Sequence, residues 1–157
     1  MDGSEGKTLC DGRLSDIIVA SFGKWKPINL GYGGFISTDT KKFLDIDPEL
    51  WLTFRFLPEF EAGLLAKLAN LDARREKLLA ECAKLKSELV KSGIASVSDI
   101  IHRDKAGLNV IVKFGSDAEK EKIINHCRKS GYEFTLCPRY IRVMDRAVSI
   151  EIKRLEL

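Results

Sequence analysis

The chain has 157 residues, of which 45% are hydrophobic, and a formal net charge of +3. This composition supports a folded core, and the length fits one domain or two small lobes around a connecting element. Uncharged apolar runs such as residues 17–20 are far too short to cross a bilayer, and residues 1–7 lack the basic-then-apolar order of a secretory signal. We therefore expect a cytoplasmic protein that contacts no membrane.

The cysteines and histidines are too few and too scattered for a zinc site or a dense disulfide framework. The four cysteines contain no Cys-x-x-Cys pair, and the chain has only two histidines. We expect reduced, mostly buried thiols. The cysteines are Cys10, Cys82, Cys127 and Cys137.

Residues 1–57 read as a β-rich segment. A branched apolar run over residues 14–22 predicts a strand that Gly23 ends, and the glycines of residues 31–34 predict a turn. Thr38 or Asp39 is placed to cap a short helix through Leu44. The alternation of apolar and polar residues over 52–56 predicts a second, half-buried strand.

Residues 58–92 predict one long helix. Pro58 suits the first helical turn, no proline or glycine falls between Leu64 and Ser92, and Gly93 is a typical C-terminal cap. At 1.5 Å per residue such a helix would be about 45 Å long, which exceeds what a small domain can cover.

A leucine recurs every seven residues along this helix, so that the leucines form one stripe. The stripe has two interpretations: a seam of a coiled coil between chains, or the face by which the helix packs on its own sheet. A seam would favour a homo-oligomer or a helical protein partner. Its residues would be Leu64, Leu68, Leu71, Leu78, Cys82, Leu85 and Leu89.

Charged residues beside the stripe favour association without fixing its direction. A parallel pair would bring Lys67 to Asp72 and Glu81 to Lys86, whereas an antiparallel pair would place Lys67 opposite Glu88. Arg75 at a core position opposes the parallel form, in which Cys82 would be placed to form a bridge between the two chains.

Residues 93–157 predict an α+β lobe of the order ββαβββ. Ser116 is placed to cap its helix, and Gly131 to end it. The five predicted strands are Val97 to His102, Leu108 to Phe114, Tyr132 to Leu136, Tyr140 to Met144 and Ala147 to Leu155. With the two preceding segments the whole chain is expected to have an α+β fold.

A short stretch resembles the nucleotidyltransferase signature. Gly33 and Gly34 follow Tyr32, and Asp45 and Asp47 follow ten residues after the glycines. In that family the glycine turn holds the nucleotide phosphates and the two carboxylates bind a divalent metal. The resemblance implies a nucleotidyl- or phosphoryl-transfer enzyme that uses Mg²⁺ or Mn²⁺.

The resemblance covers about 17 residues and departs from the pattern at Pro48, where the family has an apolar strand residue. The family also needs a third carboxylate, for which Asp99 is the natural candidate. The alternative interpretation is a glycine-rich turn followed by a solvated Asp-x-Asp-Pro turn, in which case no cofactor is expected.

Basic and aromatic residues of the C-terminal lobe form a candidate nucleic-acid surface. A ring beside a guanidinium on one face of a strand can stack on a base and bind a phosphate. The alternative is an ordinary solvated surface, because acidic residues dilute the charge. The candidates are Lys122, Arg128, Lys129, Arg139, Tyr140 and Arg142.

These patterns together predict a non-enzymatic assembly protein, whose leucine-bearing helix drives self-association or binds a partner. Nucleic-acid contact by the C-terminal lobe is an additional expectation, and metal-dependent transfer through Asp45 and Asp47 is the alternative.

Overall fold

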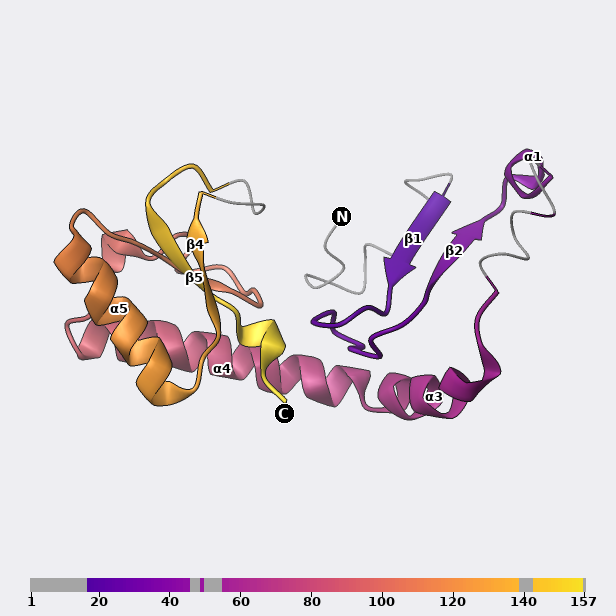
Figure 1. Cartoon of the computed structure of the whole chain (residues 1–157), viewed down its shortest axis with the longest axis horizontal. Helices are drawn as coiled ribbons and strands as arrows, with labels where there is room; N and C mark the ends of the chain where they lie inside the picture. Colours follow the sequence, from indigo (N-terminus) through magenta and orange to yellow (C-terminus); the bar gives the residue numbers. More distant parts are fainter. Residues whose placement is uncertain (1–16, 46–48, 50–54, 139–142, 157) are drawn as a thin grey trace. The chain divides into compact units, whose positions relative to one another are not determined.

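A computed structural model describes residues 17–45, 49, 55–138 and 143–156 (Figure 1). The expected α+β fold is confirmed. The chain divides into two compact units, residues 1–73 and 74–157, so that the boundary lies inside the predicted helix. Within the described residues no helix is both long and apolar enough to span a membrane.

The N-terminal unit contains a two-stranded antiparallel ribbon. Strand β1 (Ile17–Ser21) pairs with β2 (Gly34–Thr38), and Ile17, Val19 and Ile36 lie on the same face. The sequence predicts the first strand but not β2, because Gly34 at its start continues a glycine-rich stretch that fits a turn. Helix α1 (Lys41–Leu44) follows, with Thr40 at its N-cap in place of the predicted Thr38 or Asp39. Most of the predicted strand over 52–56 falls outside the described residues.

The connection between the two strands wraps around Phe22. The Phe22 amide donates to the Gly33 carbonyl, and the Phe22 carbonyl accepts from the amides of Leu30 and Gly31, each at 2.9 Å. Among residues 17–43 and 55–73, Phe22 is the only buried side chain. The N-terminal unit therefore holds a local cluster rather than an extended core.

The predicted central helix is interrupted. A 3₁₀ turn η3 (Pro58–Phe60) leads into α3 (Glu61–Ala69), and α4 (Leu71–Lys91) begins after Asn70. The Asn70 side chain donates to the Ala66 carbonyl at 2.9 Å. Asparagine side chains compete for backbone groups in this way, which ends α3 in a region whose periodicity predicts continuity.

The C-terminal unit is a three-stranded antiparallel sheet with helices α4 and α5. Strand β5 (Ala147–Ile150) lies between β3 (Val110–Lys113) and β4 (Phe134–Cys137). The predicted strand Val97 to His102 is wrong: residues 97–99 form the 3₁₀ turn η4 (Val97–Asp99), and only Ile100 bridges to Val112. Predicted strand 140–144 lies mostly outside the described residues. The predicted strand 147–155 is shorter, because η5 (Ile152–Arg154) ends it.

Helix α5 (Asp117–Ser130) has the boundaries that its sequence predicts. The Ser116 hydroxyl accepts from the Glu119 amide at 3.3 Å, and the Glu119 carboxylate accepts from the Ser116 amide at 3.2 Å. This reciprocal pair is a capping box. Gly131 ends the helix with a positive φ of 73°, which glycine adopts without steric cost.

The hydrophobic core of the C-terminal unit contains half of the leucine stripe. Residues of α4, α5 and one sheet face pack together, because Val110, Val112, Val148 and Ile150 alternate onto the same face. The α4 members are fully or almost fully buried in their own chain. The predicted seam is therefore wrong for Leu78, Cys82, Leu85 and Leu89, which follow the alternative of packing on their own sheet.

Candidate functional site

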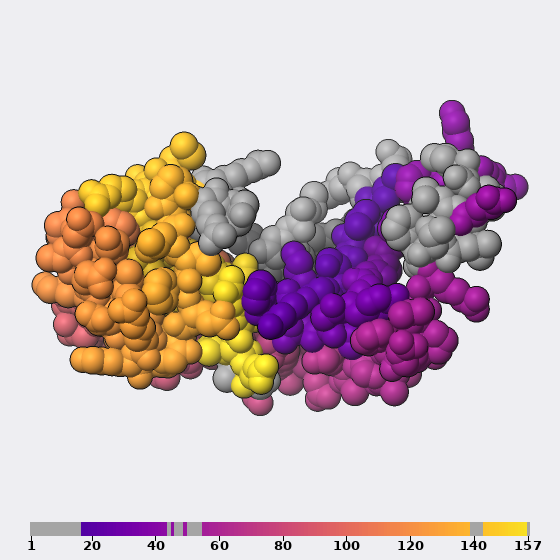
Figure 2. All heavy atoms as spheres, in the orientation of Figure 1, coloured from indigo at the N-terminus to yellow at the C-terminus, as the bar shows by residue number. Residues whose placement is uncertain are grey.

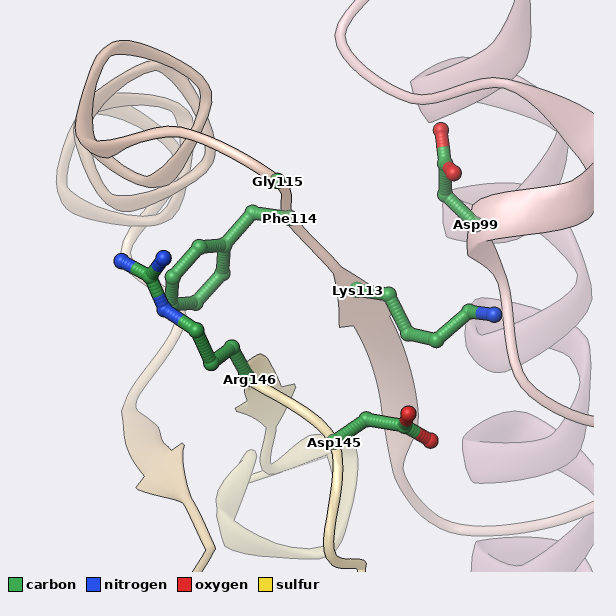
Figure 3. Close-up of a pocket in the computed structure, with 6 residues that line it drawn as sticks. All are labelled: Asp99, Lys113, Phe114, Gly115, Asp145 and Arg146. Carbon is green, nitrogen blue, oxygen red and sulfur yellow. The ribbon is translucent and has the colours of Figure 1, made fainter.

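A pocket of about 350 Å³ opens at one end of the C-terminal sheet (Figure 3). Its lining residues come from η4, from the end of β3 and from the segment that leads into β5. They are Asp99, Lys113, Phe114, Gly115, Asp145 and Arg146. The pocket thus combines two carboxylates, two cations and one aromatic ring.

Asp99, the predicted third metal ligand, has a structural role in this pocket. Its carboxylate accepts the Ser96 hydroxyl at 2.6 Å and the Ser96 amide at 2.8 Å. These two hydrogen bonds, together with the nearby Lys113 ammonium, hold the pKa of Asp99 below its usual range. The carboxylate is ionised and oriented by its own turn.

The opposite wall of the pocket is a stacked pair. The Arg146 guanidinium lies 5.1 Å from the centre of the Phe114 ring and donates to the Asp117 carboxylate at 3.2 Å. Lys120 donates to the same carboxylate at 3.1 Å, and the two cations lower the pKa of Asp117. Arg146 is thus fixed by contacts within the unit.

At the nearby N-terminus of α5 a carboxylate of the same helix takes the two amides that precede the first turn. The Glu119 carboxylate accepts from the Gly115 amide at 2.7 Å as well as from the Ser116 amide. Free amides at a helix N-terminus bind phosphate, and here a side-chain carboxylate of the same helix occupies that position.

The residues of the nucleotidyltransferase resemblance are divided between the two units and the residues that are not described. Asp45 is exposed at the end of α1, Asp99 belongs to the other unit, and Asp47 lies outside the described residues. Within the part of the chain that the structure describes, no group of three or more histidine, cysteine or acidic side chains is placed to hold a metal ion.

The two glycines of that resemblance have a packing explanation. Gly33 has a φ of 79°, and an added Cβ would lie 2.7 Å from the Phe56 ring. An added Cβ at Gly34 would collide with the Ala20 carbonyl across the ribbon. Gly33 therefore needs glycine for its backbone conformation and close approach, and Gly34 for close approach.

A buried polar network, which the sequence interpretation missed, crosses the second face of the C-terminal sheet. The Glu151 carboxylate, 4% exposed, accepts from Ser149 at 3.0 Å and from Thr135 at 3.1 Å, and pairs with Lys153 at 3.2 Å. Asn109 donates to Ser149 at 3.1 Å. Because these partners satisfy the carboxylate, the network stabilises the sheet and needs no ligand.

Lys86 is the second feature that sequence reasoning missed. Its ammonium is buried and donates to the carbonyl oxygens of His102, Arg103 and Lys105 at 3.1, 3.1 and 2.7 Å. The heptad pattern predicts Lys86 as a surface residue that pairs with Glu81 of a partner. It instead closes a turn within its own unit.

Glu81 is also engaged within the C-terminal unit. It accepts the Tyr132 hydroxyl at 2.6 Å and pairs with Lys84 at 3.2 Å. The Tyr132 hydrogen bond is the largest cause of a pKa below the usual range for Glu81. Burial and this hydrogen bond raise the pKa of Tyr132, which therefore remains a proton donor.

The surroundings of the buried cysteines make their thiols unreactive. Cys82, Cys127 and Cys137 are free and buried. Burial raises the pKa of Cys127 to about 11 and raises the pKa of Cys82 and Cys137 as well. The Cys82 bridge between chains is wrong, because this side chain is 2% exposed within the core.

The unit boundary separates the charges of the chain. Residues 1–73 carry 8 basic and 11 acidic side chains, a net charge of −3, and residues 74–157 carry 18 and 12, a net charge of +6. Lys122, Arg128 and Lys129 are exposed on α5. Arg139, Tyr140 and Arg142, the other nucleic-acid candidates, lie outside the described residues.

The N-terminal unit exposes large apolar side chains. On the ribbon, Val19 is 70% exposed, and Ile17 and Ile36 on the same face are also exposed. On α3, Leu65 is 68% exposed and Leu68 is exposed as well. We call these five residues the apolar surface of the N-terminal unit. The remaining seam candidates, Leu64 and Leu71, are half-buried.

Comparison with known proteins gives one match. Residues 73–157 match the family model described as MJ1341 family C-terminal domain, which is more than half of the chain. The match includes Asp99 but none of the other residues of the nucleotidyltransferase resemblance. No curated protein and no solved structure matches the chain.

Proposed function

The chain belongs to the MJ1341 family, and from that premise we propose that it is a non-enzymatic assembly protein, whose N-terminal unit joins a second copy of the chain. The family domain coincides with the unit that holds the core. The N-terminal unit has no such core, so we expect its exposed apolar side chains to be buried by contact with another molecule.

The observation that carries the proposal is the confinement of the core to one unit. Every member of the core cluster lies between Leu78 and Ile152. A two-stranded ribbon is at best marginally stable in water, and the exposed apolar side chains of β1, β2 and α3 give this unit apolar area that association can bury. Association would bury Val19, Ile36 and Leu65 and supply the stabilisation that the unit lacks.

A second copy is the occupant that the charges favour. Lys67 on α3 and Asp72 in the first turn of α4 carry opposite charges that can attract each other between two copies, and neither forms an ion pair with another described residue. The second pair predicted for a parallel arrangement is engaged within the C-terminal unit instead, since Glu81 binds Tyr132 and Lys86 binds backbone carbonyls. Arg75, which opposes a parallel seam, belongs to the C-terminal unit beyond Asn70.

The proposal is tested by the mass in solution. Sedimentation equilibrium is expected to give about twice the 17.6 kDa of one chain for the full-length protein. Val19→Lys with Leu65→Lys is expected to give one-chain mass, because a charged group would have to be buried without a partner. Val97→Lys with Met144→Lys, at exposed apolar positions of the C-terminal unit, is the matched control and should keep the wild-type mass.

A charge exchange separates self-association from binding to another protein. Lys67→Asp alone should weaken the dimer, and Lys67→Asp combined with Asp72→Lys should restore it. One-chain mass for the wild type at all concentrations would refute the proposal. An unchanged mass in the Val19 and Leu65 variant would show that the interface lies elsewhere.

A further inference from the structure

The exposed side chains of α5 are largely polar, and the charged ones are three basic and three acidic residues, of which two acidic ones are engaged within the unit. Lys122 and Lys129 are seven residues apart and so lie on the same side of the helix, while Arg128 lies about 100° further round, on the side that Glu121 shares. Atoms of α5, coloured orange, cover much of the visible face of the C-terminal unit (Figure 2). At 1.5 Å per residue, the backbone positions of Lys122 and Lys129 are about 10 Å apart.

The acidic groups near this face are engaged by their own unit, except for Glu121, which is exposed next to Lys122 and forms no ion pair within the described residues. Asp117 pairs with Lys120 and Arg146, and Glu119 caps the helix. Glu133 pairs with Arg154 at 2.6 Å, and Glu151 with Lys153. By contrast, Lys122, Arg128 and Lys129 form no ion pair within the described residues, so the positive charge is presented to solvent.

The apolar side chains of α5 are committed to the core. Ile123, Ile124 and Cys127 are buried, which leaves no apolar group among them to enter a lipid bilayer. A membrane-binding helix needs an exposed apolar face beside its basic one. A flexible chain of phosphates needs only cations at the surface. The side chains of α5 therefore favour a nucleic acid over a lipid surface.

Helix capping accounts for only part of this pattern. Arg128 and Lys129 lie in the last turn, where cations interact favourably with the helix dipole. Lys122 lies near the middle of the helix and gains nothing from that effect. The same unit carries a net charge of +6, twice the +3 of the whole chain.

We propose that the exposed face of α5, formed by Lys122, Arg128 and Lys129, binds the phosphate backbone of a nucleic acid without reading its sequence. This contact is independent of the association of the N-terminal units. It requires only the folded C-terminal unit and its excess of unpaired cations.

Fluorescence anisotropy of the full-length protein with a labelled single strand of about 20 nucleotides tests the proposal. Binding is expected to weaken steeply between about 50 and 200 mM salt, because binding releases counterions. Lys122→Gln, Arg128→Gln and Lys129→Gln together should weaken binding at least tenfold at the lower salt. They should also reduce the slope of log K against log salt by about 2, at about 0.7 for each lost phosphate contact.

The matched control removes three cations from elsewhere in the same unit. Lys77→Gln, Lys91→Gln and Arg103→Gln cause the same change in net charge, and binding should weaken less than threefold. Far-UV circular dichroism checks that both variants fold. Equal losses in the two variants would overturn the assignment to α5, as would undetectable binding by the wild type. Equally strong, α5-dependent binding to phosphatidylserine vesicles would overturn the choice of nucleic acid.

Discussion

The two units of this chain differ in where their apolar side chains lie. In the C-terminal unit α4, α5 and one sheet face enclose a continuous core, with Leu85 fully buried. In the N-terminal unit the described residues enclose Phe22 alone, while Leu65 is 68% exposed. Both leucines belong to neighbouring parts of one amphipathic stretch. The contrast shows that a periodic pattern of apolar residues predicts which face of a helix is buried. It does not predict whether that face is buried within the chain or between chains.

The largest expected effect is that of Leu85→Ala on the free energy of unfolding, compared with the same substitution at Leu65. Leu85→Ala should lower the free energy of unfolding by about 3 kcal/mol, because it leaves a cavity in the core. Leu65→Ala should change it by less than about 0.5 kcal/mol in dilute, monomeric protein, since the side chain is exposed. Urea denaturation measures both. Similar losses of unfolding free energy in the two variants would contradict the difference in burial between the units.

Removing the Lys86 ammonium should have a slightly smaller effect. Lys86→Met keeps the length of the side chain but leaves three carbonyl oxygens without their donor. We expect a loss of about 2–3 kcal/mol, since unsatisfied buried polar groups are costly. Lys84→Met is the control, because Lys84 is exposed and its ion pairs contribute little. If both variants unfold at the same urea concentration, the carbonyl contacts add no stability.

The hydrogen bond from Tyr132 to Glu81 should give a pH-dependent effect. The folded pKa of Glu81 lies below 4.5, so this contact stabilises the fold above that pH and is lost as the pH falls through the folded pKa. Tyr132→Phe should cost about 1 kcal/mol at pH 7 and progressively less in acid.

The equivalent change in the N-terminal unit provides the comparison. The Tyr32 hydroxyl donates to the Arg55 carbonyl at 3.3 Å, and that acceptor does not titrate. Tyr32→Phe should therefore have a small effect of the same size across this pH range. An effect of Tyr132→Phe that does not vary with pH would contradict the role given to Glu81.

The smallest expected effect concerns metal and nucleotide. Mg²⁺ or Mn²⁺ with a nucleoside triphosphate should leave the melting temperature unchanged, because the Asp99 carboxylate is engaged by Ser96 and no group of side chains among the described residues is placed to hold a metal ion. A thermal shift that Asp45→Asn abolishes would instead favour the metal-dependent transfer reaction.

Local signals in the sequence predicted much of the fold. Ser116 and Gly131 predicted both ends of α5, because capping chemistry depends on neighbouring residues only. The break at Asn70 was missed, since a leucine period continues on both sides of it. Strand β2 was missed because its one glycine, Gly34, fits a turn equally well, and because Phe35 and Ile36 are exposed rather than buried in a core.

The buried polar groups could not be predicted, because they depend on strand order. Ser149 and Glu151 alternate with apolar residues, as in a strand with one face in water. Strand β5 is central in the sheet, however, and the order of the strands is a tertiary property. Lys86 was missed for a similar reason: its three acceptors lie 16 to 19 residues further along the chain.

Lys86 occupies the place that a bound inorganic cation takes in other turns, since three converging carbonyl oxygens are a typical ligand set for a hard ion. Here the cation is covalently attached to α4 and cannot diffuse away. The turn at 102–105 should therefore withstand chelators and changes in potassium or calcium concentration. In the native protein, acylating reagents should label Lys86 far more slowly than Lys84.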